Sequence, residues 1–191
     1  MEALEAIFAR RSVGRLSEPA PSTEHLDTIL RAAATAPDHQ SLRPLRLIVL
    51  AGPAKDRFGD VLAGAYEDRC AGEGTEPVPA KLAKERTKLG RAPVVVVVAA
   101  TDTTGGKLPF VEQVCTAAAA AENALIAATA LGYGSMWRTG EPAYDGRVKA
   151  ALGLGAADAV AGFLYLGTAD PAARSAPRRP DLTGLVTHWS T

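Results

Sequence analysis

A cluster of basic residues lies close to the amino terminus of the sequence. It consists of Arg10, Arg11, Ser12 and Arg15. A phosphate group needs planar guanidinium forks and short donors within a small space, and the junction between a helix and a loop can provide both. Cations also suit the negative carboxyl end of a helix without any ligand. The cluster alone therefore predicts either a phosphate site or an ordinary helix end.

Two further segments carry hydrogen-bond donors where loops are expected. His39 follows a helix-breaking Pro37 in a donor-rich loop, and the alternative is a solvated connection in which His39 caps a backbone group. Trp137, Arg138 and Thr139 place an aromatic ring, a cation and a hydroxyl at the end of a predicted strand, where binding sites are often built. The alternative for this second segment is a core tryptophan followed by a turn.

Several other chemistries are excluded by the spacing of their residues. Gly132 and Gly134 form a GxG, but the order is helix to strand, the reverse of a dinucleotide fingerprint. No GxxxxGK[ST] or GxSxG occurs, which argues against nucleoside-triphosphate loops and serine hydrolases. The histidines lack metal-ligand spacing, and the two cysteines form no CxxC pair. We therefore expect no metal centre.

Hydrophobic periodicity and turn residues predict the elements that must position these side chains. Helices are expected over 2–10, from a cap at 21–23 to Pro37, around 58–66, and over 80–88, 111–131 and 145–152; strands are expected over 45–50, 94–98, 133–137, 160–167 and 185–189. The five valines from Val94 to Val98 predict a central strand that is buried on both faces. The Ala117–Ala121 run has so little bulk that another backbone could approach it closely.

Composition limits the class of protein. The chain has 191 residues, of which 47% are hydrophobic and 22% charged, and its formal net charge is zero. This composition favours one globular domain over residues 1–191 and gives no basic field for nucleic acid. The longest apolar run, Ala92 to Ala100, is too short for a membrane span, and the acidic start differs from a signal peptide. We expect a cytoplasmic protein.

Four ordered blocks together resemble the nitroreductase family of FMN-dependent oxidoreductases, in its minimal single-domain branch. The blocks are Arg10-Arg11-Ser12 with Arg15, Ala36-Pro37-Asp38-His39 with Pro44, the segment from Gly132 to Gly140, and the segment from Phe163 to Thr168. The resemblance implies an α+β fold in which a central mixed β-sheet is flanked by helices, and an interwoven homodimer. The alanine-rich helix would pack closely at the dimer interface, or else be a buried core helix, and residues 171–191 would pack on the partner.

The resemblance also implies a cofactor and its contacts. Arg10, Arg11 and Ser12 would hold the phosphate and ribityl end of FMN, with Thr35 beside them; Trp137, Arg138 and Thr139 would line the isoalloxazine, and His39 would reach the flavin of the other subunit. The nicotinamide of NADH or NADPH would lie near Ala127, Ala128, Thr129, Ala130, Leu131 and Gly132. Many relatives close the phosphate site with a basic residue near the carboxyl terminus, for which Arg178 and Arg179 are the candidates.

The implied reaction is carried by the flavin rather than by a side chain. Hydride from NAD(P)H would be accepted at flavin N5 and passed, in a second half-reaction, to a nitroaromatic, a quinone or a related small acceptor. No catalytic nucleophile or acid is then needed. The alternatives are a non-catalytic FMN-binding or flavin-sensing module, and a sibling chemistry such as reductive dehalogenation or flavin cleavage. Many relatives have other residues at the positions of Asp38, His39, Ser41 and Arg43 to Leu45. These differences affect the expected contacts to the acceptor more than the expected fold.

Overall fold

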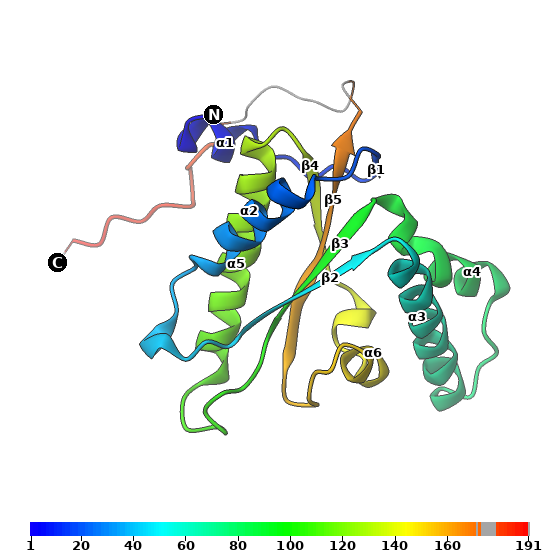
Figure 1. Ribbon diagram of the computed structural model, residues 1–191. Helices are drawn as coiled ribbons and strands as arrows, with labels where there is room; N and C mark the ends of the chain where they lie inside the picture. The colour runs from blue at the N-terminus through cyan, green and yellow to red at the C-terminus, as the bar shows by residue number, and fades with distance from the viewer. Residues whose placement is uncertain (171, 173–178, 191) are drawn as a thin grey trace.

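A computed structural model describes residues 1–170, 172 and 179–190 of the chain (Figure 1). The helices are α1 (Ala3–Ala9), α2 (Thr23–Ala34), α3 (Pro53–Gly72), α4 (Pro79–Thr87), α5 (Phe110–Ala130) and α6 (Gly146–Ala151). The strands are β1 (Leu16–Ser17), β2 (Leu45–Ala51), β3 (Val94–Ala100), β4 (Gly134–Arg138) and β5 (Ala159–Ala169). Short 3-10 turns η1 (His39–Ser41), η2 (Lys88–Arg91) and η3 (Glu141–Ala143) complete the order. The predicted helices are confirmed, as are the strands expected before residue 170.

The five strands form one sheet in the order β1-β5-β3-β2, and β4 also pairs with β5. All four named pairings are antiparallel, and one isolated parallel bridge joins Ser12 to Ser135. Every residue of β3 is buried, because the strand lies between β2 and β5 and is covered on both faces. The prediction of a central valine strand is therefore confirmed.

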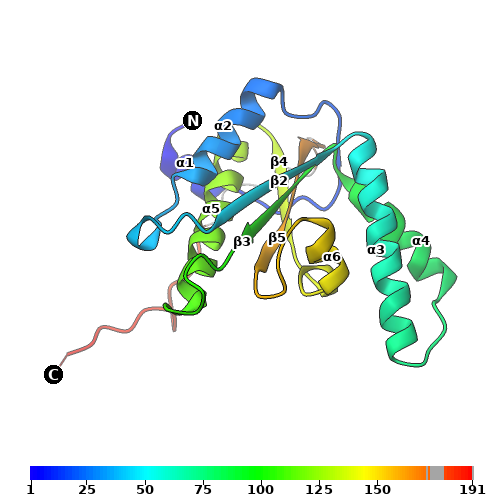
Figure 2. The same ribbon diagram turned by 60° about the horizontal axis from the view of Figure 1, so that its bottom comes forward.

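Helices cover both faces of the sheet. Val95 and Val97 of β3 share a hydrophobic cluster with residues of α3 and α6, whereas Val96 and Val98 share one with α2 and α5. Because successive side chains of a strand point to opposite faces, this alternation assigns α3 and α6 to one layer and α2 and α5 to the other. Figures 1 and 2 show the two layers on opposite sides of the strands, with α4 packed beside α3.

The alanine-rich stretch of α5 is part of the core of the chain. Ala117, Ala120 and Ala121 are fully buried and pack among residues of β3, β5 and α2. Their small size lets the helix backbone lie close to the sheet, which supports the core-helix alternative for this face of α5. The dimer role of α5 stays a prediction for its other face. Gly132, with φ of +87°, ends the helix as expected.

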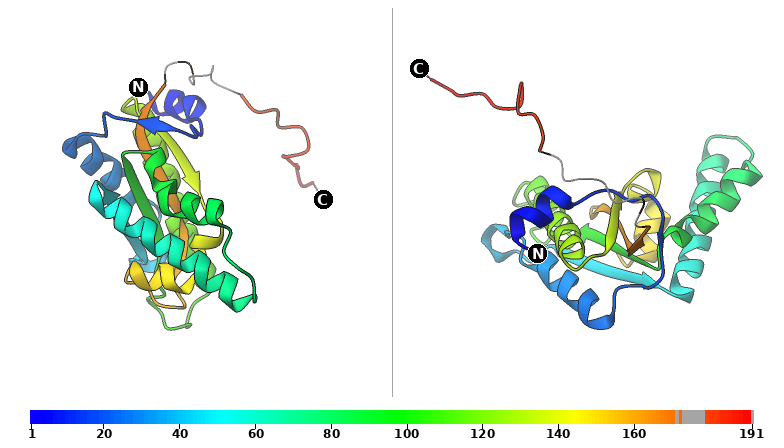
Figure 3. Two further views of the ribbon diagram at one scale, coloured as in Figure 1. Left: turned by 90° about the vertical axis from the view of Figure 1, so that its right-hand side faces the viewer. Right: turned by 90° about the horizontal axis from the view of Figure 1, so that it is seen from above.

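The strand expected over 185–189 is wrong. Residues 179–190 contain no strand, and Leu185 and Trp189 are 73% and 85% exposed. A strand needs a neighbour for its backbone groups, and Figure 3 shows this segment extending away from the sheet. The two-residue β1 was not anticipated, since it is too short for any hydrophobic period. Within the described residues, no helix is both long and apolar enough to cross a membrane.

Candidate active site

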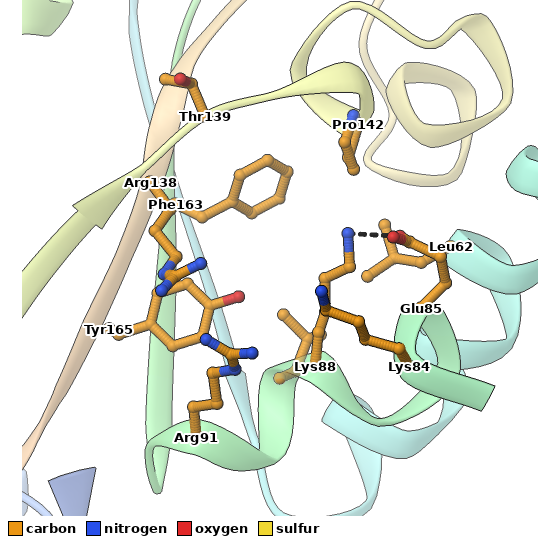
Figure 4. A pocket seen from close by; sticks show the side chains of 11 residues that line it. Leu62, Lys84, Glu85, Lys88, Arg91, Arg138, Thr139, Pro142, Phe163 and Tyr165 are labelled. Carbon is orange, nitrogen blue, oxygen red and sulfur yellow. Dashed lines mark ion pairs between the residues drawn. The ribbon is translucent and has the colours of Figure 1, made fainter. Parts of the chain in front are cut away.

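Two adjacent cavities lie on the α3 side of the sheet. One of about 200 Å³ is enclosed by α3, α4, η2, η3, the end of β4 and the middle of β5, and the other, of about 430 Å³, opens beside it toward Gly14 and Arg15. Both are lined by Lys84, Lys88 and Arg91. Figure 4 shows the first cavity with Arg138 and Tyr165 on its sheet side.

The two cavities are strongly cationic. Five cations line one or both of them: Arg15, Lys84, Lys88, Arg91 and Arg138. Among the described lining residues, Glu85 is the acidic one. Glu85 forms an ion pair with Lys88. Within the part of the chain that the structure describes, Arg15, Lys84, Arg91 and Arg138 form no ion pair. Unpaired cations around a cavity favour an anionic ligand.

Tyr165 adds a neutral hydroxyl to this cavity. The residue is 4% exposed, and its hydroxyl group points into the cavity in Figure 4. Burial raises the pKa of Tyr165 above its usual value, against the opposing influence of the Arg138 and Arg91 guanidinium groups. The phenol therefore keeps its proton at neutral pH. Since the hydroxyl has no hydrogen-bond partner in the described part of the chain, it can serve a ligand.

The amino-terminal cluster is distributed over two places. The Arg10 guanidinium lies 3.3 Å from the Glu122 carboxylate of α5, and Arg11 donates to the backbone carbonyl of Phe8 at 2.7 Å. This bond places the Arg11 guanidinium at the carboxyl end of α1, which is the contact expected for an ordinary helix end. Ser12 lies beside β4 through its bridge with Ser135, and the chain continues to Arg15 at the open cavity. The cluster therefore connects α1 to the cavity.

Thr35 and His39 lie along α5, at different heights. The Thr35 hydroxyl lies 3.4 Å from the Asn123 amide, next to the Glu122 partner of Arg10, so Thr35 and Arg10 both lie beside this part of α5. His39 Nε2 is 3.5 Å from Glu112, ten positions earlier in the helix. At 1.5 Å per residue the two places are about 15 Å apart along α5. His39 is therefore separated from the amino-terminal cluster within this chain.

The loop around His39 has an unusual backbone. Gln40, Ser41 and Arg43 all have φ between +53° and +57°, a region that non-glycine residues seldom occupy. The Asp38 carboxylate accepts a hydrogen bond from the Arg43 amide at 2.8 Å and closes the loop. Such strain persists only where the surroundings impose it, and it is often found at binding sites. Beside the loop, His39 lines an open hollow of about 490 Å³.

The Trp137–Thr139 segment is divided between the two faces of the sheet. The Trp137 indole donates to the carbonyl of Ala161 at 3.0 Å and lies so close to Gly162 that a Cβ there would overlap it. It packs on the α5 side, whereas Arg138 and Thr139 line the cavity. Two of the three predicted ring contacts thus lie at one site, and a contact between the Trp137 indole and flavin stays a prediction.

The proposed nicotinamide segment lies elsewhere. Residues 127–130 form the last turn of α5 and residues 131–132 follow it directly; Ala127, Ala128 and Leu131 pack on the opposite face of the sheet from the cavity. The Arg179 guanidinium lies over the Phe8 ring, 5.7 Å from its centre, near the end of α1. Arg178 lies outside the described residues.

Sequence reasoning missed the residues that dominate the cavity. Lys84 and Lys88 belong to the helix expected over 80–88, and Arg91 lies outside every predicted element. A signal was present, because these positions follow an i, i+4, i+7 spacing and so share one face of a helix. Nothing comparable marked Tyr165, which reads as a core residue of a buried strand.

Comparison with known proteins identifies the family. The family model described as "Nitroreductase family" matches residues 7–168. The chain belongs to the nitroreductase family. Among the family's curated members, it is 38% identical over 190 residues to the Escherichia coli (strain K12) protein named "Putative NAD(P)H nitroreductase YdjA", which covers 99% of this chain and 100% of that protein.

Solved nitroreductase structures share the fold. A nitroreductase-like family protein from Bacillus cereus matches with a TM-score of 0.80 at 21% identity, over 100% of this chain and 97% of that one. A Bacteroides fragilis nitroreductase with bound FMN matches with a TM-score of 0.73 at 24% identity, over the whole of both chains. At these identities, the likeness confirms the α+β nitroreductase fold.

Proposed function

We propose that this nitroreductase-family chain is an FMN-dependent oxidoreductase that takes hydride from NADH or NADPH and reduces a nitroaromatic, a quinone or a related small acceptor. The observation that carries the proposal is the cationic cavity beside the end of β4 and the middle of β5. Two relatives support the proposal: the Escherichia coli protein is named for NAD(P)H, and the Bacteroides fragilis structure contains FMN. We further propose that residues 1–191 form one domain and act in the cytoplasm.

The residues around the cavity fit FMN by their chemistry. Arg138 and Thr139 at the end of β4 and Tyr165 in β5 would face the ring, while Arg15, Lys84 and Arg91 supply positive charge. FMN is an anion with an aromatic ring, so it needs donors and cations beside apolar walls, and Leu62 and Phe163 provide such walls. When bound, FMN supplies the two-electron chemistry.

The protein's own task is to bind and to polarise. Arg138 and Arg91 lie near Tyr165 in the cavity and would supply positive charge to a reduced ring bound there, because a preorganised cation lowers the free energy of an anion without moving. The Tyr165 phenol, which stays protonated, can donate a hydrogen bond to a ring heteroatom. Arg10, Arg11 and Ser12 are proposed to hold the phosphate and ribityl end, with Thr35 beside them.

The site is proposed to be completed by a second copy of the chain. His39 lies on the opposite side of the sheet from the cavity, next to Glu112 at the start of α5. His39 is also about 15 Å along α5 from the Arg10 region, so we propose that it contacts the flavin of a partner subunit and not that of its own chain. A symmetric homodimer would satisfy this requirement for both copies.

The colour and absorbance of the purified protein test the proposal directly. We expect a yellow protein, or a colourless one that becomes yellow when FMN is added, and rapid bleaching of the flavin by NADH or NADPH in a stopped-flow instrument. Reduction slower than about one per minute, against a typical enzyme turnover of about ten per second, would instead favour an FMN-binding module without turnover. A protein that binds no FMN at all would refute both functions.

A further inference from the structure

Glu85 is a buried negative charge in an otherwise positive cavity. The residue is 8% exposed, and its carboxylate forms an ion pair with the Lys88 ammonium three positions along the chain. Figure 4 shows this pair facing Arg91, Arg138 and Tyr165 across the cavity. A buried carboxylate is unfavourable unless a cation compensates it, so the Lys88 ammonium is held by Glu85 rather than left free for a ligand.

We propose that Glu85 is a positioning residue, which fixes the Lys88 ammonium in the cavity wall and lowers the positive charge that a bound flavin experiences. This inference rests on the proposed function, because flavin is the ligand concerned. The flavin would be reduced more easily without Glu85, because its reduced ring is an anion that nearby cations stabilise. Glu85 thereby lowers the reduction potential of a flavin bound in the cavity.

The surrounding charges leave Glu85 without a substitute. Lys84 and Arg91 come from the same helical segment, Arg138 from β4 and Arg15 from the loop before β1, and all are cationic. Tyr165 is neutral, since burial raises its pKa. No other carboxylate lines the described walls of the two cavities, so the charge of the site depends on Glu85.

The fold also places the pair with little freedom. Gly59 of α3 meets α4 so closely that a Cβ there would overlap the carbonyl oxygen of Arg86, the residue after Glu85. The backbone that carries Glu85 and Lys88 is therefore fixed against α3. A fixed ion pair can set a redox potential, whereas a solvated pair on a mobile side chain is screened.

The experiment is an equilibrium reduction titration of FMN-loaded protein against a redox dye, for the wild type and Glu85→Gln at pH 8. One added charge about 10 Å from the ring, at an effective dielectric of about 20, favours the reduced flavin about tenfold. This is about 30 mV toward positive potential for a two-electron couple. Glu85→Gln with Lys88→Gln restores the net charge, so the double variant should have the wild-type potential.

Asp60→Asn is the matched control. It removes one negative charge from an exposed ion pair, 3.0 Å apart, that joins Asp60 of α3 to Arg86 of α4. Solvent should screen the effect of this substitution on the potential. If Glu85→Gln fails to fold, the comparison of Lys88→Gln with the double variant carries the test, because the two differ only in the charge of Glu85. The potential of Lys88→Gln should be the more negative of the two by about 30 mV.

Each outcome decides the matter. The role of Glu85 is overturned if Glu85→Gln has the potential of the wild type. It is also overturned if Asp60→Asn shifts the potential as far as Glu85→Gln does. In both cases the proposed binding of FMN is unaffected. Equal potentials in Lys88→Gln and in the double variant overturn the role of Glu85 in the same way. Wild-type protein that takes up no FMN overturns the proposed function and this inference together.

Discussion

Gly59→Ala should destabilise the chain although it replaces a glycine inside a helix. The new Cβ would overlap the Arg86 carbonyl oxygen and lie 3.1 Å from the carbonyl carbon, so α3 and α4 must move apart. Overpacking against backbone of this kind costs about 2–3 kcal/mol, and the better helix propensity of alanine returns about 1 kcal/mol. We expect a net loss of about 1–2 kcal/mol, with weaker FMN binding because α4 carries the cavity cations.

Gly72→Ala is the matched control in the same helix. Nothing lies within 4 Å of a Cβ at Gly72, so the substitution should be neutral or stabilise by up to about 0.5–1 kcal/mol. Urea unfolding followed by circular dichroism should separate the two variants by about 2 kcal/mol, or roughly 4–8 °C in Tm for a chain of this size. Equal stability of the two alanine variants would refute the close approach of α3 and α4.

Three further predictions concern the remaining parts of the site and fold. Arg10→Ala should weaken FMN binding by about 1.5–3 kcal/mol, because charge-assisted phosphate contacts are of that size. Glu122→Gln removes the ion-pair partner of Arg10 and should tighten FMN binding. Equal FMN affinities of the variants and the wild type in a fluorescence titration would remove Arg10 from the site. His39→Ala should slow turnover while FMN affinity falls only slightly, and unchanged steady-state rates would speak against a contact with the partner's flavin. Hydrogen bonds from Thr104 lower the pKa of Asp102. The contribution of Asp102 to stability is therefore present above about pH 4 and is lost as the pH falls through the depressed pKa. The difference in Tm between wild type and Asp102→Ala should close on acidification, and a difference that does not change with pH would refute this.

The sequence predicts most of the fold because its signals are local. The valine run of β3, the Ser22 cap of α2 and Gly132 at the end of α5 each act over a few residues, and all appear in the structure where they were expected. The wrong strand at 185–189 shows the limit. Its β-branched and aromatic residues favour a strand locally, but a strand also requires an available sheet edge, which no local pattern reports.

The site was less predictable because it depends on which elements meet. Arg138 and Thr139 were identified, yet their neighbours Lys84 and Arg91 come from a segment about fifty residues earlier in the chain. Only the packing of α4 beside α3 and the sheet brings them together. Glu85 is harder still, since a carboxylate in a charged helix normally faces water, and its burial follows from the tertiary contact at Gly59.

The register of β4 links the two faces of the sheet. Trp137 pairs with Leu164 and anchors its indole on Gly162 and the Ala161 carbonyl, while Arg138 pairs with Phe163 and points to the cavity. A slip of one residue would exchange the two side chains, placing a guanidinium in the α5 core and an indole in the cavity. The fit of Trp137 on one face therefore fixes the direction of Arg138 on the other, and the charge of the cavity depends on packing that lies outside it.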